Sequence, residues 1–176
     1  MSIASGPIFQ LAWVVHDIEA AEREFTERYG VDKWVRMPRM RFGPDSCSYR
    51  GAPADYTIDS SLGYAGGQQL ELIAPVSGAN LYTEALERSG PGLHHIAWVP
   101  NDFDAALAEA LAGGVEIVQH CAVAEIGMEF VYLAGGPLGS YVELLRLPAD
   151  ARALFDSMIP DGYRNPWSHG QGASRE

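Results

Sequence analysis

Four polar residues lie in otherwise apolar, strand-like segments and are of the types that bind a divalent metal ion. They are Gln10, Glu71, His95 and Glu143. One imidazole and three oxygen donors suit a Lewis-acid ion such as Zn, Mn, Co, Ni or Mg, with water at the remaining positions. Two carboxylates also neutralise a divalent cation, so an ion could be held without a net buried charge.

An internal repeat groups these four residues. Residues 9–25 align without gaps on residues 94–110 at an offset of 85, and seven of the 17 aligned positions are identical, where roughly one is expected by chance. The alignment pairs Gln10 with His95, each two residues before a shared Ala-Trp-Val. A strand-like segment with a central Glu follows each copy. A single such Glu or Gln usually faces solvent, but four equivalent positions favour a metal-binding cup.

The elements that must position these residues follow the same order twice. Apolar and β-branched runs predict strands, and recurring apolar residues after an N-capping Asp predict helices. The result is an α+β fold of two tandem βαβββ modules, with the segment 38–53 as an irregular loop or a short strand. The predicted boundaries are a domain over 1–147, with modules at about 7–75 and 92–147 and a linker at 76–91, then a C-terminal helix and flexible tail over 148–176.

Strand alternation assigns the polar residues to one face. Gln10 shares a face with Ala12, and the small alanine leaves room above the sheet. In the second copy the repeat places His95 in the cup and His94 on the opposite, helix-covered face. A β-bulge would invert this assignment.

Composition restricts the class of protein. The chain has 176 residues and a formal net charge of −11, which argues against binding to nucleic acid or to anionic membranes. We find no apolar segment long enough to span a membrane and no signal pattern. The two cysteines, Cys47 and Cys121, imply no disulfide framework, so we expect a reduced, cytoplasmic protein. We expect a small-molecule substrate and a homodimer.

The repeated (Gln/His)-x-x-Ala-Trp-Val-x-x-Asp pattern, and GLHHIAWVPND in particular, resembles the vicinal oxygen chelate superfamily. This group includes glyoxalase I, methylmalonyl-CoA epimerase, extradiol ring-cleaving dioxygenases and bleomycin-resistance proteins. The resemblance covers about residues 8–147 and looks nearest to the epimerase-like branch. It implies that the two modules curl into an incomplete, cup-shaped mixed β-barrel, with helices outside and a divalent metal inside.

The resemblance also implies a chemistry. Members bind two neighbouring substrate oxygens to the metal and stabilise an enolate. Glu143 is then the first choice for the proton-moving base and Glu71 the second, although the sequence does not separate a base from a ligand. Ring-cleaving oxygenases hold Fe(II) with two His and one carboxylate. Gln10 in place of the first His makes that reaction less favoured, although Fe(II) stays among the candidate ions.

We therefore predict a metal-dependent isomerase, epimerase or lyase that acts on a small carbonyl or acyl-CoA compound. The alternatives are a non-catalytic, bleomycin-resistance-like binding protein and a ring-cleaving dioxygenase. Residues 31–50 carry five basic residues and two acidic ones. This segment could bind a substrate carboxylate or coenzyme A phosphates, or it could be a solvated loop.

Overall fold

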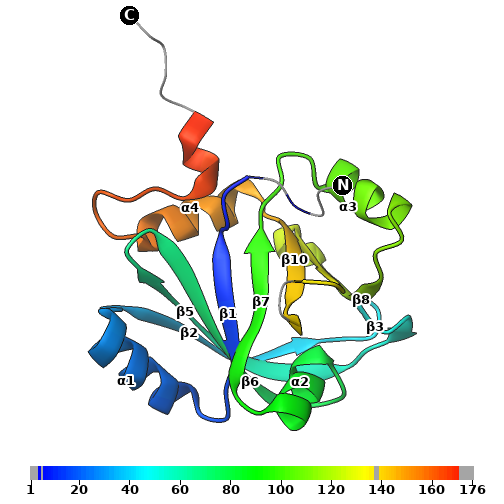
Figure 1. Cartoon of the computed structure of the whole chain (residues 1–176), viewed down its shortest axis with the longest axis horizontal. Coiled ribbons are helices and arrows are strands. Elements are labelled where there is room, and N and C mark those ends of the chain that lie inside the picture. The colour runs from blue at the N-terminus through cyan, green and yellow to red at the C-terminus, as the bar shows by residue number, and fades with distance from the viewer. Residues whose placement is uncertain (1–3, 5, 137–138, 171–176) are drawn as a thin grey trace, which may run out of the picture.

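The computed structural model describes residues 4, 6–136 and 139–170. These residues form ten strands in one curled mixed sheet, four α-helices and short 3-10 turns. The predicted α+β class and the cup-shaped half-barrel are confirmed (Figure 1). Within the described residues, no helix is both long enough and apolar enough to cross a membrane.

The elements follow the chain in two similar series. The first series is β1 (Gln10–Val14), α1 (Ile18–Tyr29), β2 (Trp34–Phe42), β3 (Cys47–Tyr49), β4 (Ala52–Pro53), β5 (Tyr56–Ala65) and β6 (Gln68–Ser77). Helix α2 (Leu81–Ser89) leads to the second series, which is β7 (Gly92–Trp98), α3 (Phe103–Ala112), β8 (Ile117–Val123), η1 (Ala124–Ile126), β9 (Met128–Leu133) and β10 (Tyr141–Arg146). The chain continues through α4 (Ala149–Met158) to η3 (Pro166–Gly170).

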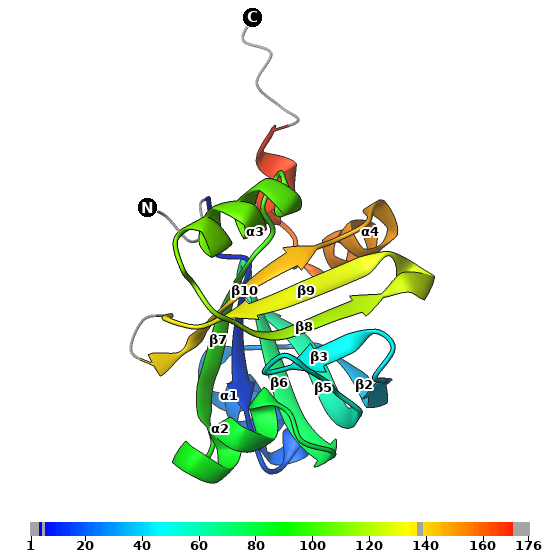
Figure 2. The ribbon, with the colours of Figure 1, turned by 90° about the vertical axis from the view of Figure 1, so that its right-hand side faces the viewer.

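The sheet order shows the duplication directly. It runs β2-β5-β6-β1-β7-β10-β9-β8-β3-β4, so the four strands on one side of the β1–β7 junction mirror the first four of the six on the other side. β1 and β7 are antiparallel, whereas each pairs in parallel with the last strand of its own module. Figure 2 shows the two halves meeting along this junction, with α3 outside the curl. The central strands β6, β1, β7 and β10 are the ones that carry the four polar residues.

Equivalent capping residues begin the two repeated helices. The side chain of Asp17 accepts a hydrogen bond from the amide of Ala20 at 3.0 Å, and Asp102 accepts one from Ala105 at 2.9 Å. A carboxylate at this position satisfies an amide that the first helical turn leaves unpaired. Gly30 ends α1 in the left-handed region, at φ 69°. The repeat therefore preserves the helix start as well as the strand pattern.

β2 is longer than the sequence predicts. Strand structure continues through Pro38 to Phe42, where we predicted that the first strand segment ends at Met37 and that residues 38–53 form an irregular loop or a short strand. β2 is an edge strand that pairs only with β5, so Pro38 removes no hydrogen bond that a second neighbour would need. The register with β5 shifts between Met37 and Met40, and Arg39 adopts φ 54° there. The edge position and this bulge accommodate residues that would break a central strand.

Two apolar clusters fill the two sides of the sheet. The larger cluster lies inside the curl, where Phe42 stacks on Tyr56 at 5.0 Å between ring centroids and Phe130 meets Phe42 edge-on at 5.6 Å. The smaller cluster lies beneath α3 and includes Phe103 and Leu144. The alternation along β10 therefore sends Leu144 to the helix side and its neighbours Glu143 and Leu145 to the inside.

The two cysteines form a disulfide, which corrects the expectation that both are free. Cys47 of β3 is bonded to Cys121 of β8, across a sequence separation of 74 residues. The two residues are directly paired in the β3–β8 ladder. β3 belongs to the first module by sequence but extends the sheet edge of the second. The sequence shows no reason for this pairing, because it depends on where the 38–53 segment crosses the molecule.

The C-terminal segment docks on the body, where we predicted a flexible tail. Phe155 and Trp167 both contact the ring of Phe9, at 5.6 and 5.0 Å between centroids. Asn165 is buried, with 1% of its surface exposed. In Figure 1, α4 lies at one end of the curled sheet. Residues 171–176 of the predicted tail lie outside the described residues.

Candidate functional site

The structure brings all four predicted polar side chains together. Gln10 of β1, Glu71 of β6 and Glu143 of β10 approach the imidazole of His95 in β7. His95 Nε2 lies 3.2 Å from Glu143 Oε2, 3.3 Å from Gln10 Oε1 and 3.7 Å from Glu71 Oε2. His95 is fully buried and Glu143 is 3% exposed. The cluster therefore lies inside the curled sheet and not on a solvent face.

The strand register explains why these side chains meet. Across the β1–β7 junction, Gln10 pairs with Ala97 and Ala12 pairs with His95. The same alanines lie beside the carboxylates, since Ala12 pairs with Glu71 and Ala97 with Glu143. Both alanines are fully buried. Each polar side chain therefore has a methyl group beside it, and this leaves room for the four to converge.

His94 and His95 are not separated by the strand as regular alternation predicts. The β1–β7 register shifts at this point, so that Ala12 pairs with His95 but Trp13 pairs with Leu93. The extra residue in the bulge is His94, whose Nδ1 comes within 2.9 Å of His95 Nδ1. His94 also packs 5.0 Å from the ring of Tyr82 in α2. It therefore lies on the same side of the strand as His95, beneath α2, and not on the opposite face that regular alternation predicts.

A chain of hydrogen bonds orients Gln10. Its Nε2 donates to Gln69 Oε1 at 2.8 Å, and Gln69 Nε2 donates to the Tyr64 hydroxyl at 2.9 Å. Tyr64 donates to Asn165 Oδ1 at 3.0 Å, and Asn165 Nδ2 donates to the Asp156 carboxylate at 2.8 Å. Because every donor points away from the cluster and the chain ends on an anion, the Gln10 amide oxygen is the atom left facing His95. The sequence alone does not link the C-terminal segment to this residue.

Burial changes the acid–base properties of the cluster. Burial raises the pKa of Glu71 to about 7, and the Glu143 carboxylate adds to the effect, while nearby His95 and a hydrogen bond from Ser60 oppose it. Burial lowers the pKa of His94 well below its usual value, and His95 lowers it further. His94 is therefore neutral near pH 7, and its Nδ1 can accept a hydrogen bond from His95 Nδ1–H.

The raised pKa of Glu71 makes the stability of the protein, stripped of divalent metal, depend on pH. Between about 4.5 and 7 the folded protein keeps a proton that the unfolded chain has released, so this contribution to stability is complete below 4.5 and is lost as the pH rises through 7. We expect the free energy of unfolding to fall by roughly 2 kcal/mol between pH 5.5 and 7.5. Urea unfolding in a chelating buffer measures it. The same slope in Glu71→Gln would assign the titration to another group.

The donor set fits a divalent ion after small side-chain rotations. Donor atoms around one ion, bound at about 2.1 Å, lie roughly 3.0 to 3.4 Å apart, and the three contacts to His95 Nε2 span 3.2 to 3.7 Å. As placed, no three His, Cys, Asp or Glu side chains in the described part of the chain could hold an ion. Glu143 Oε2 is buried and makes no hydrogen bond to any described residue, so its carboxylate can turn without breaking one.

An apolar cavity of about 190 Å³ opens above the cluster. Gln10, Glu71 and Glu143 form its polar floor. Its walls come from β2, β5, β9 and β10, and α4 covers one side with Ala151, Leu154, Phe155 and Met158. The sequence predicts the polar residues of the floor but not the apolar residues of the walls. Apolar residues recur at helical spacing in α4, but their spacing does not show which part of the protein the helix covers.

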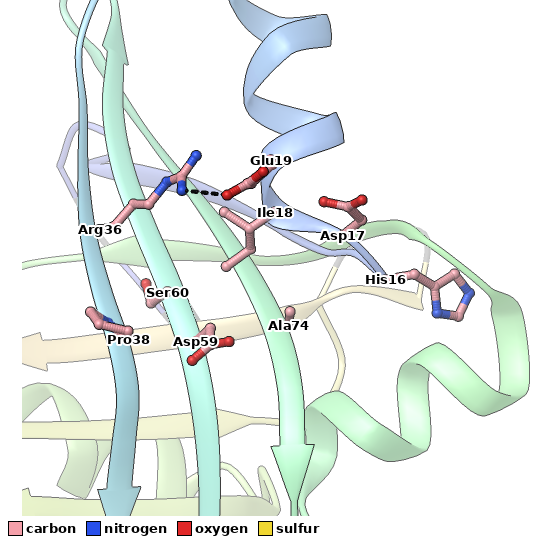
Figure 3. Close-up of a pocket in the computed structure, with 9 residues that line it drawn as sticks. All are labelled: His16, Asp17, Ile18, Glu19, Arg36, Pro38, Asp59, Ser60 and Ala74. Carbon is pink, nitrogen blue, oxygen red and sulfur yellow. Dashed lines mark hydrogen bonds and ion pairs between the residues drawn. The ribbon is translucent and has the colours of Figure 1, made fainter.

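The basic segment 31–50 is largely neutralised by carboxylates of the same chain. Arg36 is bound by Glu22 and Glu19, and Figure 3 shows it pointing toward α1. Arg41 pairs with Asp55 at 2.7 Å, and Arg50 pairs with Glu84 at 2.8 Å. A polar pocket of about 410 Å³ beside α1 includes Arg36, Asp59 and Ser60 (Figure 3). These ion pairs favour a structural role for the arginines over an anion-binding patch.

The fold and the cluster define a duplicated βαβββ protein with an enclosed polar centre, and comparison with known proteins agrees. The model of the Glyoxalase/Bleomycin resistance protein/Dioxygenase superfamily matches residues 9–132, so the chain belongs to this superfamily. A search of curated proteins finds no match to the sequence.

Among solved structures, methylmalonyl-CoA epimerase from Mycobacterium tuberculosis is similar, with a TM-score of 0.60, 19% identity, and coverage of 86% of this chain and 94% of that one. A hypothetical protein from Bacillus halodurans C-125 has a TM-score of 0.59 and 18% identity, with 81% and 94% covered. A Streptomyces coelicolor methylmalonyl-CoA epimerase variant in complex with 2-nitronate-propionyl-CoA has a TM-score of 0.56 and 20% identity, with 83% and 97% covered. These matches agree with the predicted epimerase-like branch, and at such identities they establish the fold alone.

Proposed function

We propose that this protein is a metal-dependent isomerase, epimerase or lyase that removes a proton from carbon next to a carbonyl group. The observation that carries the proposal is the convergence of Gln10, Glu71, His95 and Glu143 on one point at the floor of an apolar cavity. These four residues would hold the ion, which is Zn, Mn, Co, Ni, Mg or Fe(II). When bound, a divalent cation supplies Lewis-acid stabilisation of the negative charge that develops on a carbonyl oxygen.

The two carboxylates differ in their suitability as the base. Glu71 Oε1 accepts a hydrogen bond from Ser60 at 2.7 Å. Glu143, in contrast, lines the cavity, and its Oε2 makes no hydrogen bond within the described residues, although it lies 3.2 Å from His95 Nε2. A carboxylate at the cavity with no hydrogen bond on one oxygen can take the proton from carbon and return it to the neighbouring position. Glu143 is therefore the proposed catalytic base, and Glu71 is the second candidate.

His94 is proposed to set the tautomer of His95. For His95 Nε2 to bind an ion, its proton must sit on Nδ1, which lies 2.9 Å from His94 Nδ1. Neutral His94 Nδ1 can accept a hydrogen bond from that N–H group, and such a partner orients a metal-binding imidazole. His94 is thus a positioning residue.

Metal analysis combined with proton exchange tests this function. Purified protein is analysed for bound metal, and exchange of the α-proton in D₂O is followed by NMR with α-hydroxyketones and acyl-CoA compounds. Acyl-CoA belongs in the panel because similar structures contain such ligands. We expect metal at about one equivalent per chain and exchange that stops with a chelator. Protein that neither binds divalent metal nor exchanges any of these protons is not an enzyme of this type.

A binding protein without catalysis is the second candidate, and the apolar character of the cavity favours it. A site of this kind retains a ligand through its walls and has no need of the polar floor. It would bind a hydrophobic molecule equally well with and without metal, and it would exchange no protons. The same experiment therefore separates the two functions.

The hydrogen-bond chain from Asp156 to Gln10 predicts that a distant hydroxyl controls metal affinity. Tyr64→Phe leaves Gln69 Nε2 and Asn165 Oδ1 without their partner, so Gln10 loses its fixed orientation. We expect metal affinity to fall by about 10- to 100-fold, as for lost outer-shell partners, and stability to fall by about 1–3 kcal/mol. Metal titration and urea unfolding measure the two effects.

Tyr163→Phe is the matched control, since it removes a tyrosine hydroxyl from the C-terminal segment that supplies Asn165 and Asp156 to the chain of hydrogen bonds, at a residue that is 54% exposed. It should leave both measurements unchanged. Native metal affinity in Tyr64→Phe would show that the chain of hydrogen bonds serves stability alone.

A further inference from the structure

We propose that the substrate is an uncharged, apolar α-hydroxycarbonyl compound, and not a carboxylated acyl-CoA. The two oxygens of such a compound would meet the polar floor of the cavity while its hydrocarbon part fills the space above. The inference that the substrate has two neighbouring oxygens rests on the proposed function. The inference that the rest of the substrate is apolar and uncharged rests on the cavity walls, which are an independent observation.

The cavity walls offer nothing to a negative charge. No Lys or Arg is among the described residues that line the cavity, and its ionisable floor consists of two carboxylates, Glu71 and Glu143. A substrate carboxylate or phosphate inside would lose its hydration without gaining a basic side chain as counter-ion, and Glu71 and Glu143 already neutralise the divalent ion of the proposed function. The walls are methionine, aromatic and branched aliphatic side chains, such as Met37, Met40, Phe42, Ile58, Phe130 and Leu145. These side chains solvate hydrocarbon.

The nearby arginines do not change this conclusion. Arg36 of β2 points toward α1 on the other side of the strand, where Glu19 and Glu22 bind it (Figure 3). Arg41, on the same strand, is held by Asp55. Turning either arginine toward the cavity would leave a carboxylate without its ion-pair partner, and for Arg36 that carboxylate is the largely buried Glu22.

The mouth of the cavity is apolar as well. Leu154 of α4 and Ile126 of η1 both line the cavity, and each is 54% exposed. Ligand pockets are clefts lined mainly by apolar side chains, and these two residues extend the apolar lining to the surface. The hydrocarbon part of a ligand therefore contacts apolar side chains from the floor of the cavity to its rim, and each added methylene of the ligand gains further apolar contacts.

Binding of matched ligands tests the substrate class. The neutral probes are 1-hydroxy-2-butanone, 1-hydroxy-2-pentanone and 1-hydroxy-2-hexanone. The charged probes are methylmalonyl-CoA and 5-hydroxy-4-oxopentanoate, in which a carboxylate replaces the terminal methyl group of the pentanone. Isothermal titration is carried out on protein with and without added Zn²⁺. We expect affinity to rise about fourfold for each added methylene. The carboxylated probe should bind at least about tenfold more weakly than the neutral pentanone.

A different ranking overturns the inference. Tighter binding of 5-hydroxy-4-oxopentanoate or methylmalonyl-CoA than of the neutral ketones would do so, as would no binding of any neutral ketone. The proposed function fails separately. Neutral ketones that bind with the expected length dependence, but without bound metal or proton exchange, would retain the apolar site and reject the enzyme. Proton exchange with methylmalonyl-CoA alone would retain the enzyme and reject the apolar, uncharged substrate.

A pair of surface variants locates the binding site. Leu154→Asp places a charge at the cavity rim, at a position exposed enough to tolerate it, and should weaken 1-hydroxy-2-hexanone binding by about tenfold with metal content unchanged. Leu111→Asp is the control, because Leu111 of α3 is 48% exposed and is not among the lining residues. It should bind as the native protein does. Equal affinity in both variants would place the ligand elsewhere.

Discussion

Glu143→Gln is expected to lower turnover by about 10²- to 10⁴-fold, the range that general base catalysis typically contributes. The substitution keeps an oxygen that can bind the metal but removes the basic carboxylate. Metal content, measured by elemental analysis, should therefore survive largely intact, while deuterium incorporation into the substrate nearly stops. The effect is large because Glu143 lines the cavity and no described residue donates a hydrogen bond to its Oε2.

Glu71→Gln is the natural comparison, since Glu71 is the other carboxylate of the cluster but accepts a hydrogen bond from Ser60. It should weaken metal affinity first and slow exchange mainly through that loss, so that excess metal restores much of the rate. Near-normal exchange in Glu143→Gln would place the base elsewhere. In a pure binding protein, neither variant would have any turnover to lose.

His95→Ala is expected to abolish metal retention. His95 Nε2 is the atom that Gln10, Glu71 and Glu143 all approach within 3.7 Å, so its removal takes away the central donor. The loss of affinity should exceed the 10- to 100-fold that outer-shell changes typically cost. Titration with Zn²⁺ and with Mn²⁺ measures it.

His94→Ala should have a smaller effect of a different kind. It removes the partner of His95 Nδ1 and a buried ring beside Tyr82, so we expect about a 10- to 100-fold loss of metal affinity together with lower stability. His94→Asn retains a side-chain acceptor and should recover part of the affinity. Equal losses in the His94 and His95 alanine variants would show that the repeat does not identify the ligand.

The sequence by itself determined the duplicated architecture and the positions of the four polar residues. The repeat carries this information because equivalent strands in the two halves meet about the β1–β7 junction, so residues 85 apart take equivalent places. The capping aspartates Asp17 and Asp102 belong to the same local signal. Local sequence suffices for strand alternation and helix starts because both depend on neighbours a few residues away.

Only the tertiary structure decided what surrounds these residues. The bulge at His94, the Cys47–Cys121 disulfide and the pairing of Arg36 with Glu22 join elements that are distant in sequence. The same holds for α4 as a cavity wall and for Asp156 as the end of a chain that begins at Gln10. Residue types and spacing in one segment do not specify which distant segment it meets, because that depends on how the whole sheet curls. The polar floor could therefore be predicted from the sequence, whereas the apolar walls of the cavity could not.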